Sequence, residues 1–504
     1  MSTKRKIIIF AFLQYAQLAL TMIYGVFLLP VYIKYLNVDM YGAWLASGNI
    51  VSWLQVIVPD CGQVLMQRLG DAYARKDISR FSGIAVTGNL VTLTLGLVVI
   101  LLGLGVSMHL DVLLNLSDSV DVQALGTAFV MTAAGTGLVI YTQAYSSANL
   151  ALQATGYYGM INLAASLVRI IVVLYGIFVA KQGVVALGMG NFIYGICLLL
   201  GHSGIYFKVC FYEKIPVLSK PSALQEISTL FSFSAFARIG ETFARNIDYF
   251  LVARFLGPEF TTSLKLIKAV PEAILPFIRT TTYSIIPSLI QQIANGRIKE
   301  NKSLLMNFTG KLIMFCVFVL GGITALNEAF VGLWIPGSTY LSGYIPLFII
   351  AGLVLAAISD VFRKYVMAIG CIKDVTLIIG VSSFLQALCL FFMTKQYGLI
   401  GIATVPLCVY TITLALFILR FKRELQLEWF DFKKVAADMI LGSFLALLAG
   451  VSIFNMQTDS WGEFLLSGMT YISVFLLLGL VLSRNLRCIL IQLWRKPTSV
   501  CNKI

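Results

Sequence analysis

Apolar runs of roughly twenty residues recur along the whole chain, separated by short polar segments or by segments that contain Gly and Pro. A helix needs about 20 apolar residues to cross the hydrocarbon core of a bilayer, where only helices and closed barrels satisfy their backbone hydrogen bonds. Of the 504 residues, 59% are hydrophobic and 12% are charged, whereas about 25% are charged in an average soluble domain. The pattern therefore predicts an all-α polytopic membrane protein.

The boundaries of the apolar runs predict fourteen transmembrane helices. These cover residues 7–33, 41–58, 81–106, 122–150, 157–180, 184–207, 227–255, 262–290, 304–326, 341–362, 374–394, 398–419, 437–455 and 462–482. Because the number is even, both termini are expected on one side of the membrane. The first apolar stretch is too long for a signal peptide and no small-x-small cleavage site follows it, so we expect an uncleaved first span.

Basic residues are distributed very unequally between the two sides that this topology defines. With a cytoplasmic N-terminus, 26 of the 37 Lys and Arg residues fall in cytoplasmic segments, among them Arg363 and Lys364. Three lie in outer loops and the other eight lie within spans. Cytoplasmic loops are enriched in Lys and Arg, so the bias supports the count and predicts that both termini are cytoplasmic. It also accounts for the net charge of +14 without nucleic-acid binding.

The connecting segments carry no signature of an enzyme or a metal site. They reach at most about twenty residues, and the chain contains no Asp-x-Asp pair, no Gly-x-Ser-x-Gly and no Walker lysine loop. The nine cysteines are scattered without a Cys-x-x-Cys, and His109 and His202 lie far apart. We therefore expect neither an enzyme nor a cofactor, and cysteines that act as small buried apolar side chains.

Two pairs of segments resemble each other between the halves of the chain. Ala154-Thr155-Gly156 opens a span that ends at Lys181, and Ala368-Ile369-Gly370 opens one that ends at Lys395, with the same spacing from Gly to Lys. Residues 35–39 after the first span and 255–259 after the seventh form the second pair. The repeat predicts two related six-helix bundles, residues 1–222 and 223–426, followed by two additional helices and a basic cytoplasmic tail in residues 427–504.

Charged side chains at helical spacing interrupt two of the predicted spans. The seventh carries Arg238, Glu241, Arg245 and Asp248, the eighth carries Lys265, Lys268, Glu272 and Arg279, and the fifth carries Arg169. A charge at the bilayer centre costs about 2.5 to 3.5 kcal/mol, so these faces are expected to line a watered cavity or the protein interior. Two interpretations stay open. The charges neutralise one another as intrahelical pairs, or their basic excess attracts an anionic substrate.

Several segments occur in an order that is typical of a known family. They are Leu29-Pro30-Val31-Tyr32, Tyr41-Gly42-Ala43-Trp44, Pro59-Asp60-Cys61-Gly62, Asn246-Ile247-Asp248-Tyr249, Phe255-Leu256-Gly257-Pro258, Val331-Gly332-Leu333-Trp334 and Tyr397-Gly398-Leu399-Ile400. In order and spacing they resemble the polysaccharide flippase family of the multidrug/oligosaccharidyl-lipid/polysaccharide exporter (MOP) superfamily. Asp248 matches a commonly acidic position, whereas Asn37 stands in a turn where the family commonly has glycine.

The resemblance implies two six-helix bundles around a central cavity, in a protein of the bacterial inner membrane. Such proteins export undecaprenyl-pyrophosphate-linked sugar units by alternating access for O-antigen, lipopolysaccharide, capsule or exopolysaccharide assembly. Fourteen spans are similar to the flippase for the peptidoglycan lipid precursor, where the extra pair is associated with a groove for the lipid tail. Proteins of polysaccharide assembly are then candidate partners, besides the substrate and membrane lipids.

The basic residues of the spans are the candidates for binding the pyrophosphate, since arginine makes two-pronged contacts to phosphate oxygens. The membrane potential could drive outward movement of the anion, or Glu241, Asp248 or Glu272 could carry H⁺ or Na⁺. A cation-coupled multidrug exporter of the same superfamily is the first alternative and predicts an acidic cavity. An envelope polysaccharide polymerase or ligase is the second alternative. Such enzymes typically have a long outer loop with basic residues, whereas the outer loop from Ser107 to Asp121 lacks Lys and Arg.

Overall fold

The computed structural model describes residues 12–17, 19–20, 24–25, 27–56, 61–116, 119–217, 220–221, 233–283, 298–337, 340–454, 456 and 458–482. Within these residues all regular secondary structure is helical. Ten helices are long and apolar enough to cross a membrane. They are α5 (Ile78–Ser107), α7 (Val122–Ala151), α8 (Thr155–Phe178), α9 (Val185–Tyr212), α15 (Ile298–Trp334), α16 (Tyr344–Ala368), α17 (Ile372–Tyr397), α18 (Leu399–Glu424), α19 (Trp429–Ile453) and α20 (Trp461–Leu482). The predicted all-α polytopic membrane protein is confirmed.

The other four predicted spans correspond to shorter or more polar elements. The described end of the first is α2 (Leu29–Leu36), and residues 7–11, 18, 21–23 and 26 of that span lie outside the described residues. The second is α3 (Val38–Val56). The eighth is α13 (Pro258–Tyr283), which contains the charged positions 265, 268, 272 and 279. The seventh is not the single helix that we expected, because α11 (Phe233–Arg245) ends before α12 (Asp248–Leu256) begins.

The chain divides into two compact units. The N-terminal unit comprises residues 1–262 and 379–398, and the C-terminal unit comprises residues 263–378 and 399–504. The predicted domain boundaries near residues 222 and 426 stay predictions, and residues 222–232 lie outside the described part.

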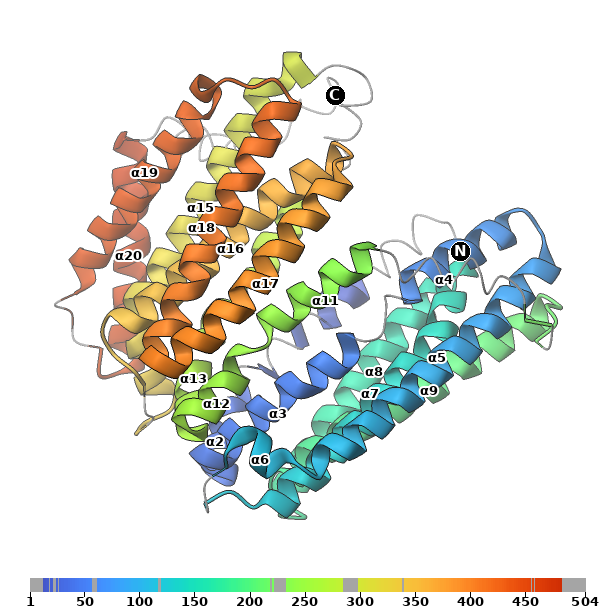
Figure 1. Ribbon diagram of the computed structural model, residues 1–504. Coiled ribbons are helices and arrows are strands. Elements are labelled where there is room, and N and C mark those ends of the chain that lie inside the picture. Colours follow the sequence, from blue (N-terminus) through green and yellow to red (C-terminus); the bar gives the residue numbers. More distant parts are fainter. Residues whose placement is uncertain are drawn as a thin grey trace. The chain divides into compact units, whose positions relative to one another are not determined.

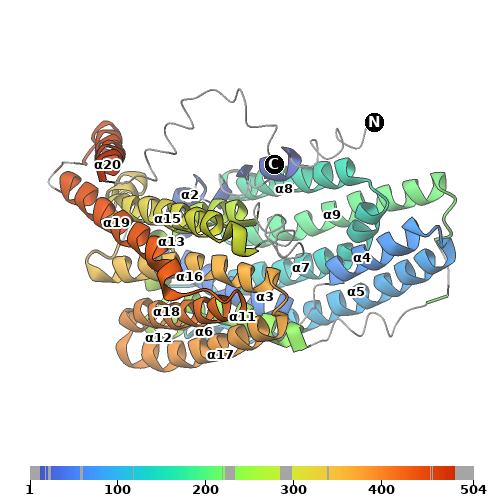
Figure 2. The ribbon, with the colours of Figure 1, turned by 90° about the horizontal axis from the view of Figure 1, so that it is seen from above.

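Small residues bring the long helices of the N-terminal unit into close contact. α5, α7, α8 and α9 lie side by side, with α4 (Cys61–Ala74) against α5 and α7 (Figure 1, Figure 2). A Cβ at Gly135 of α7 would lie 2.4 Å from the carbonyl oxygen of Asn191 in α9. A Cβ at Gly188 of α9 would lie equally close, at 2.4 Å, to the carbonyl oxygen of Ala128. Glycines at these crossings let backbones approach as they do at interfaces between transmembrane helices.

Aromatic side chains fill the contacts between helices in the C-terminal unit. α16 packs on α18, where the rings of Tyr365 and Phe421 lie 5.5 Å apart. α15 packs on α19 and α20, and the Tyr471 hydroxyl of α20 donates a hydrogen bond of 2.9 Å to the carbonyl oxygen of Phe318. α16 continues to Ala368, so Arg363 and Lys364 lie in a helix and not in the loop that the apolar pattern suggested.

The two segments 35–39 and 255–259 form similar corners inside the N-terminal unit. α2 ends at Leu36 before Asn37 (φ 65°), and α12 ends at Leu256 before Gly257 (φ 113°). Asparagine tolerates a positive φ better than most residues, and Asn37 Oδ1 accepts a hydrogen bond of 2.8 Å from the backbone N–H of Met40. The helices that follow the two corners, α3 and α13, are in contact there: Thr262 Oγ1 donates a hydrogen bond of 2.7 Å to the carbonyl oxygen of Val38.

Candidate functional site

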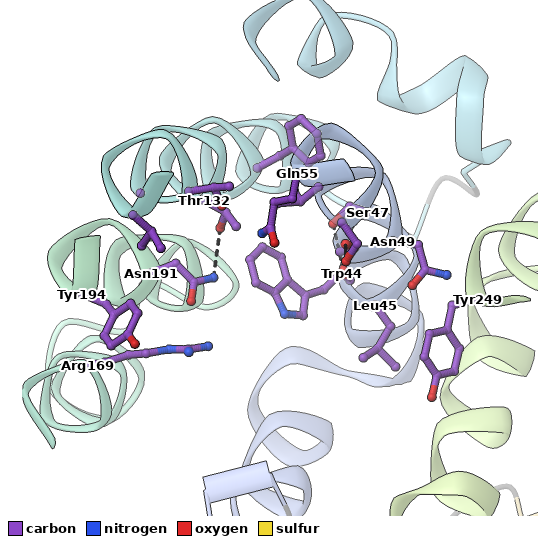
Figure 3. Close-up of a pocket in the computed structure, with 17 residues that line it drawn as sticks. Trp44, Leu45, Ser47, Asn49, Gln55, Thr132, Arg169, Asn191, Tyr194 and Tyr249 are labelled. Atoms are coloured by element: carbon purple, nitrogen blue, oxygen red, sulfur yellow. Dashed lines mark hydrogen bonds between the residues drawn. The ribbon is translucent and has the colours of Figure 1, made fainter. Parts of the chain in front are cut away.

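A cavity of about 460 Å³ lies inside the N-terminal unit, between α3, α7, α8, α9 and α12, and its mainly apolar wall carries several polar groups (Figure 3). This volume is within the range of about 300 to 1,000 Å³ that is usual for small-molecule sites. Seventeen residues line it: Trp44, Leu45, Ser47, Gly48, Asn49, Val51, Ser52, Gln55, Phe129, Thr132, Gly135, Thr136, Val139, Arg169, Asn191, Tyr194 and Tyr249.

The lining combines the aromatic rings of Trp44, Phe129, Tyr194 and Tyr249 with hydroxyl and amide groups. The Trp44 ring, the Asn191 amide and the Arg169 guanidinium point into the same space in Figure 3. Asn191 Nδ2 donates to Thr132 Oγ1 over 3.2 Å, across the close contact between α7 and α9. Asn49 is buried, and its Nδ2 has no hydrogen-bond partner within the described structure. A buried amide without a partner is unusual in a folded protein and is consistent with a ligand site.

Arg169 is the one charged residue among the seventeen that line the cavity. Its Cζ lies 5.0 Å from the ring centroid of Tyr24 and 5.8 Å from that of Tyr194, within cation-π range. In the described part of the chain it makes no ion pair and no hydrogen bond, and its Nε is buried without a partner. An arginine in a membrane-spanning helix that faces a cavity without an acid is a candidate anion-binding residue.

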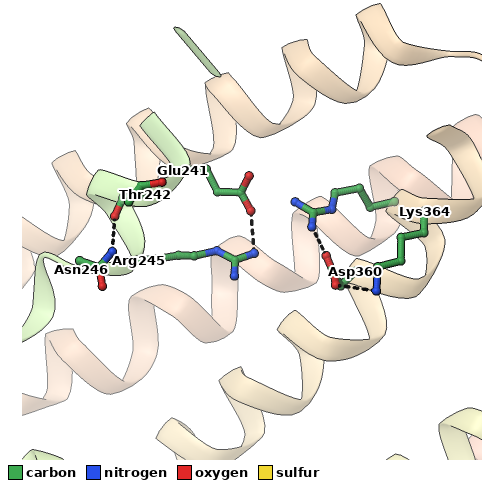
Figure 4. Close-up of polar contacts among 7 residues, drawn as sticks. Glu241, Thr242, Arg245, Asn246, Asp360 and Lys364 are labelled. Atoms are coloured by element: carbon green, nitrogen blue, oxygen red, sulfur yellow. Dashed lines mark hydrogen bonds and ion pairs between the residues drawn. The ribbon is translucent and has the colours of Figure 1, made fainter. Parts of the chain in front are cut away.

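The structure pairs four of the other predicted site residues, two in each of two helices. In α11, Arg245 Nη2 lies 2.6 Å from Glu241 Oε1 (Figure 4). In α13, Lys265 Nζ lies 2.6 Å from Glu272 Oε2. These contacts are the intrahelical pairs of the first interpretation. They leave the net charge of the two helices unchanged but neutralise one cation in each.

Of the remaining predicted site residues, Asp248 and Lys268 have interactions of their own, and the other two have side chains outside the described part. Asp248 stands at the start of α12, beyond the break after Arg245, and its Oδ1 accepts a hydrogen bond of 2.9 Å from the backbone N–H of Tyr249. Lys268 has an interaction partner. The side chains of Arg238 and Arg279 lie outside the described part. The substrate-binding role of all of these residues stays a prediction.

Sequence reasoning missed most of the cavity and one buried ionic cluster. Asn49, Ser52 and Gln55 are spaced three apart in the second apolar run, and this spacing was the available signal for a polar helical face. The ionic cluster lies in α16, where Asp360 contacts both Arg363 and Lys364 (Figure 4). Lys364 Nζ lies 3.3 Å from Asp360 Oδ2, and both side chains are buried.

Comparisons with solved structures assign the fold. Over 95% of this chain and 100% of the other, the structure is similar to the lipid II flippase MurJ in an inward closed conformation, with a TM-score of 0.68 and 15% sequence identity. A multidrug resistance MATE family transporter of the MOP superfamily, in its inward-facing conformation, gives a TM-score of 0.64 at 12% identity over 80% of this chain and 95% of that one. The chain has the fold of MurJ and of this MOP superfamily transporter.

Other comparisons agree with this fold or add nothing to it. The outward-facing conformation of a MATE transporter gives a TM-score of 0.56 at 11% identity, over 83% of this chain and 95% of that one. No protein-family model and no curated protein matches the sequence. The resemblance expected from the sequence is thus confirmed at the level of the fold, and the solved structures that share this fold are a lipid II flippase and multidrug resistance transporters.

Proposed function

We propose that this protein is a flippase for an anionic lipid-linked oligosaccharide. It moves the undecaprenyl-pyrophosphate-linked unit from the cytoplasmic to the outer leaflet of a bacterial inner membrane by alternating access, for assembly of a surface polysaccharide such as O-antigen or capsule. Both termini are cytoplasmic in this proposal. The observation that carries it is Arg169, which faces an acid-free cavity without an ion pair in the described structure.

The sign of the charge in the cavity favours a flippase over a drug exporter. A cation in this space would meet the Arg169 guanidinium and no carboxylate among the lining residues. Like charges disfavour binding in a site of low dielectric, whereas an oxyanion gains charge-assisted hydrogen bonds from an arginine. The Gln55 and Asn191 amides beside the Trp44 ring also suit a sugar, which has both an apolar C–H face and hydroxyl groups.

The paired charges outside the cavity take a second role in this proposal. Each of Arg245 and Lys265 is a candidate to exchange its own carboxylate partner, Glu241 or Glu272, for a phosphate oxygen of the substrate, and Arg238, Lys268 and Arg279 are further candidates. Exchange of one anionic partner for another avoids leaving a cation unpaired in a region of low dielectric. The released carboxylates, and Asp248, are then the groups that can take up H⁺ or Na⁺ if the cycle is ion-coupled.

The purified protein in proteoliposomes provides the test. The probes are fluorescent undecaprenyl-pyrophosphate lipids, one with a neutral disaccharide and one with a glucuronate-containing disaccharide, and their leaflet exchange is followed by dithionite quenching. We expect exchange of at least one probe well above that of protein-free liposomes. If the protein exchanges neither lipid but exports ethidium in response to a proton or sodium gradient, it is a drug exporter instead.

A matched pair of tryptophan variants connects this activity with the cavity. Trp44→Ala removes the aromatic wall of the cavity, and we expect the exchange rate to fall about tenfold, which corresponds to about 1.4 kcal/mol. Trp461→Ala changes an exposed tryptophan at the start of α20 and should leave the rate within twofold of wild type. Equal exchange rates for the two variants would contradict the assignment of the cavity as a substrate-binding site.

A further inference from the structure

We propose that the cavity of the N-terminal unit binds a sugar ring that carries a single carboxylate, and that Arg169 recognises that carboxylate. The proposal rests on the proposed flippase function and names the substrate more closely. It assigns to this cavity the acidic sugar of the lipid-linked unit and not its pyrophosphate.

The number of charges in the cavity is the first argument. Its seventeen lining residues include one cation and no acid, so one negative charge on a ligand balances the site. A pyrophosphate diester carries about two negative charges, and burying an uncompensated charge in low dielectric is costly. A uronate-type sugar carries one negative charge at neutral pH, because carboxyl groups titrate near pH 4. The charge balance therefore favours the carboxylate.

The way in which Arg169 is held is the second argument. The Tyr24 and Tyr194 rings lie within 5.0 and 5.8 Å of its Cζ, and its Nε is buried. The terminal amino groups therefore remain as the donors for a ligand, at the end of a side chain that extends into the cavity (Figure 3). Two parallel N–H donors from a guanidinium match the two oxygens of one carboxylate.

The rest of the lining is the third argument. Trp44 presents a ring face on which the C–H face of a sugar can stack, and Gln55 and Asn191 carry amides on the same side of α3 for its hydroxyl groups (Figure 3). Ser47 and Ser52 already donate to carbonyl oxygens of α3, and Asn191 donates to Thr132. The cost of an isoprenoid tail therefore falls on the Arg169 guanidinium, which would stay in the cavity without an anionic partner. The cavity therefore fits a sugar ring and excludes the lipid tail.

Two undecaprenyl-pyrophosphate probes test this inference: the glucuronate-containing lipid and its methyl ester, which lacks only the charge of the carboxylate. We expect the wild-type protein to exchange the glucuronate-containing lipid at least tenfold faster than its methyl ester. Arg169→Gln should lose this preference and exchange the two lipids at the same rate. Arg169→Lys keeps the positive charge but not the two parallel N–H donors, and it should retain part of the preference. Lys181→Gln, in an exposed turn between α8 and α9, is the control and should retain all of it.

The outcomes separate this inference from the proposed function. If Arg169→Gln slows both lipids by the same factor, Arg169 acts on the shared pyrophosphate, and the carboxylate assignment is wrong although the flippase activity stands. A wild-type protein that exchanges ester and acid equally would overturn the inference in the same way. Because a variant can fail through misfolding, free methyl glucuronide and methyl glucoside are also added to the wild type. Inhibition of exchange by the glucuronide alone supports the inference, and equal effects of the two sugars contradict it.

Discussion

Gly42 in α3 lies directly against the backbone of Pro258 at one corner of the N-terminal unit, and only glycine leaves room for this contact. A Cβ at this position would lie 1.7 Å from the carbonyl oxygen of Pro258, which is backbone and cannot move aside without shifting the start of α13. Overpacking of this kind typically costs 1 to 3 kcal/mol, and the rigidity of the obstacle places Gly42→Ala at about 3 kcal/mol or more. We expect a clearly lower melting temperature of the detergent-solubilised protein.

Gly48, in the same helix, supplies the matched control. A Cβ there would meet nothing within 4 Å, so Gly48→Ala should leave the melting temperature unchanged or raise it slightly through better helix propensity. Similar melting temperatures for the two alanine variants would show that the corner between Gly42 and Pro258 is not a tight contact in solution.

The break between α11 and α12 explains why one part of the candidate site could not be predicted from spacing. Residues 238, 241, 245 and 248 have ideal helical spacing, and neither Gly nor Pro lies between Arg245 and Asp248. However, Asn246 Nδ2 donates to the carbonyl oxygen of Thr242 over 2.8 Å, and Asp248 Oδ1 accepts from the next backbone N–H. Such local side-chain bonds compete with the helix ladder and depend on the surrounding structure, so the pattern of residue types does not reveal them.

The ionic cluster of α16 leads to a prediction at the scale of one helix. Asp360 contacts both Arg363 and Lys364, and its side chain is 7% exposed. Removing one partner of a buried ion pair costs about 3 to 5 kcal/mol, so Asp360→Leu should strongly reduce the melting temperature and the yield of folded protein. Lys364→Met should cost less, because Arg363 still contacts the carboxylate.

The double variant tests whether the loss arises from uncompensated charge. Replacing both members of a buried pair by apolar residues is often neutral, so Asp360→Leu/Lys364→Met should recover part of the stability that Asp360→Leu loses. A double variant less stable than Asp360→Leu would mean that Lys364 contributes mainly through other contacts.

At the scale of the whole molecule, the sequence predicted the membrane architecture far better than the site. Length and apolarity of the runs determine which segments can enter a bilayer, so the ten long helices were readily found. The cavity depends on which helices cross closely, for example where Gly135 of α7 meets Asn191 of α9. Of its lining, the sequence indicated only Arg169, because a charge inside an apolar run is visible without knowledge of the helix neighbours.

The orientation of the molecule is testable with epitopes inserted in two exposed turns of the full-length protein. The turn at Lys76 joins α4 to α5, and the turn at Lys181 joins α8 to α9. Because basic residues concentrate on the cytoplasmic side, antibodies should label the tag at residue 181 in intact spheroplasts and the tag at residue 76 only after permeabilisation. The reverse pattern would invert the proposed topology and the direction of transport.

The membrane potential provides a final prediction for the complete cycle. Moving one charge across the membrane is worth about 2.3 kcal/mol per 100 mV, so a pyrophosphate with two charges gains about 4.6 kcal/mol when it leaves a negative interior. In proteoliposomes with a potassium gradient and valinomycin, an inside-negative potential should therefore move the lipid-linked probe to the outer leaflet, and reversal of the gradient should move it back.

An acidic sugar adds a third charge, so the glucuronate-containing lipid should respond more steeply to the potential than its methyl ester. This comparison needs no calibration of absolute rates, because both lipids share one protein and one membrane. A distribution that ignores the potential but follows a proton or sodium gradient would instead assign the driving force to an acidic residue, with Glu241, Asp248 and Glu272 as the candidates. Their amide variants Glu241→Gln, Asp248→Asn and Glu272→Gln would then identify which carboxylate carries the ion.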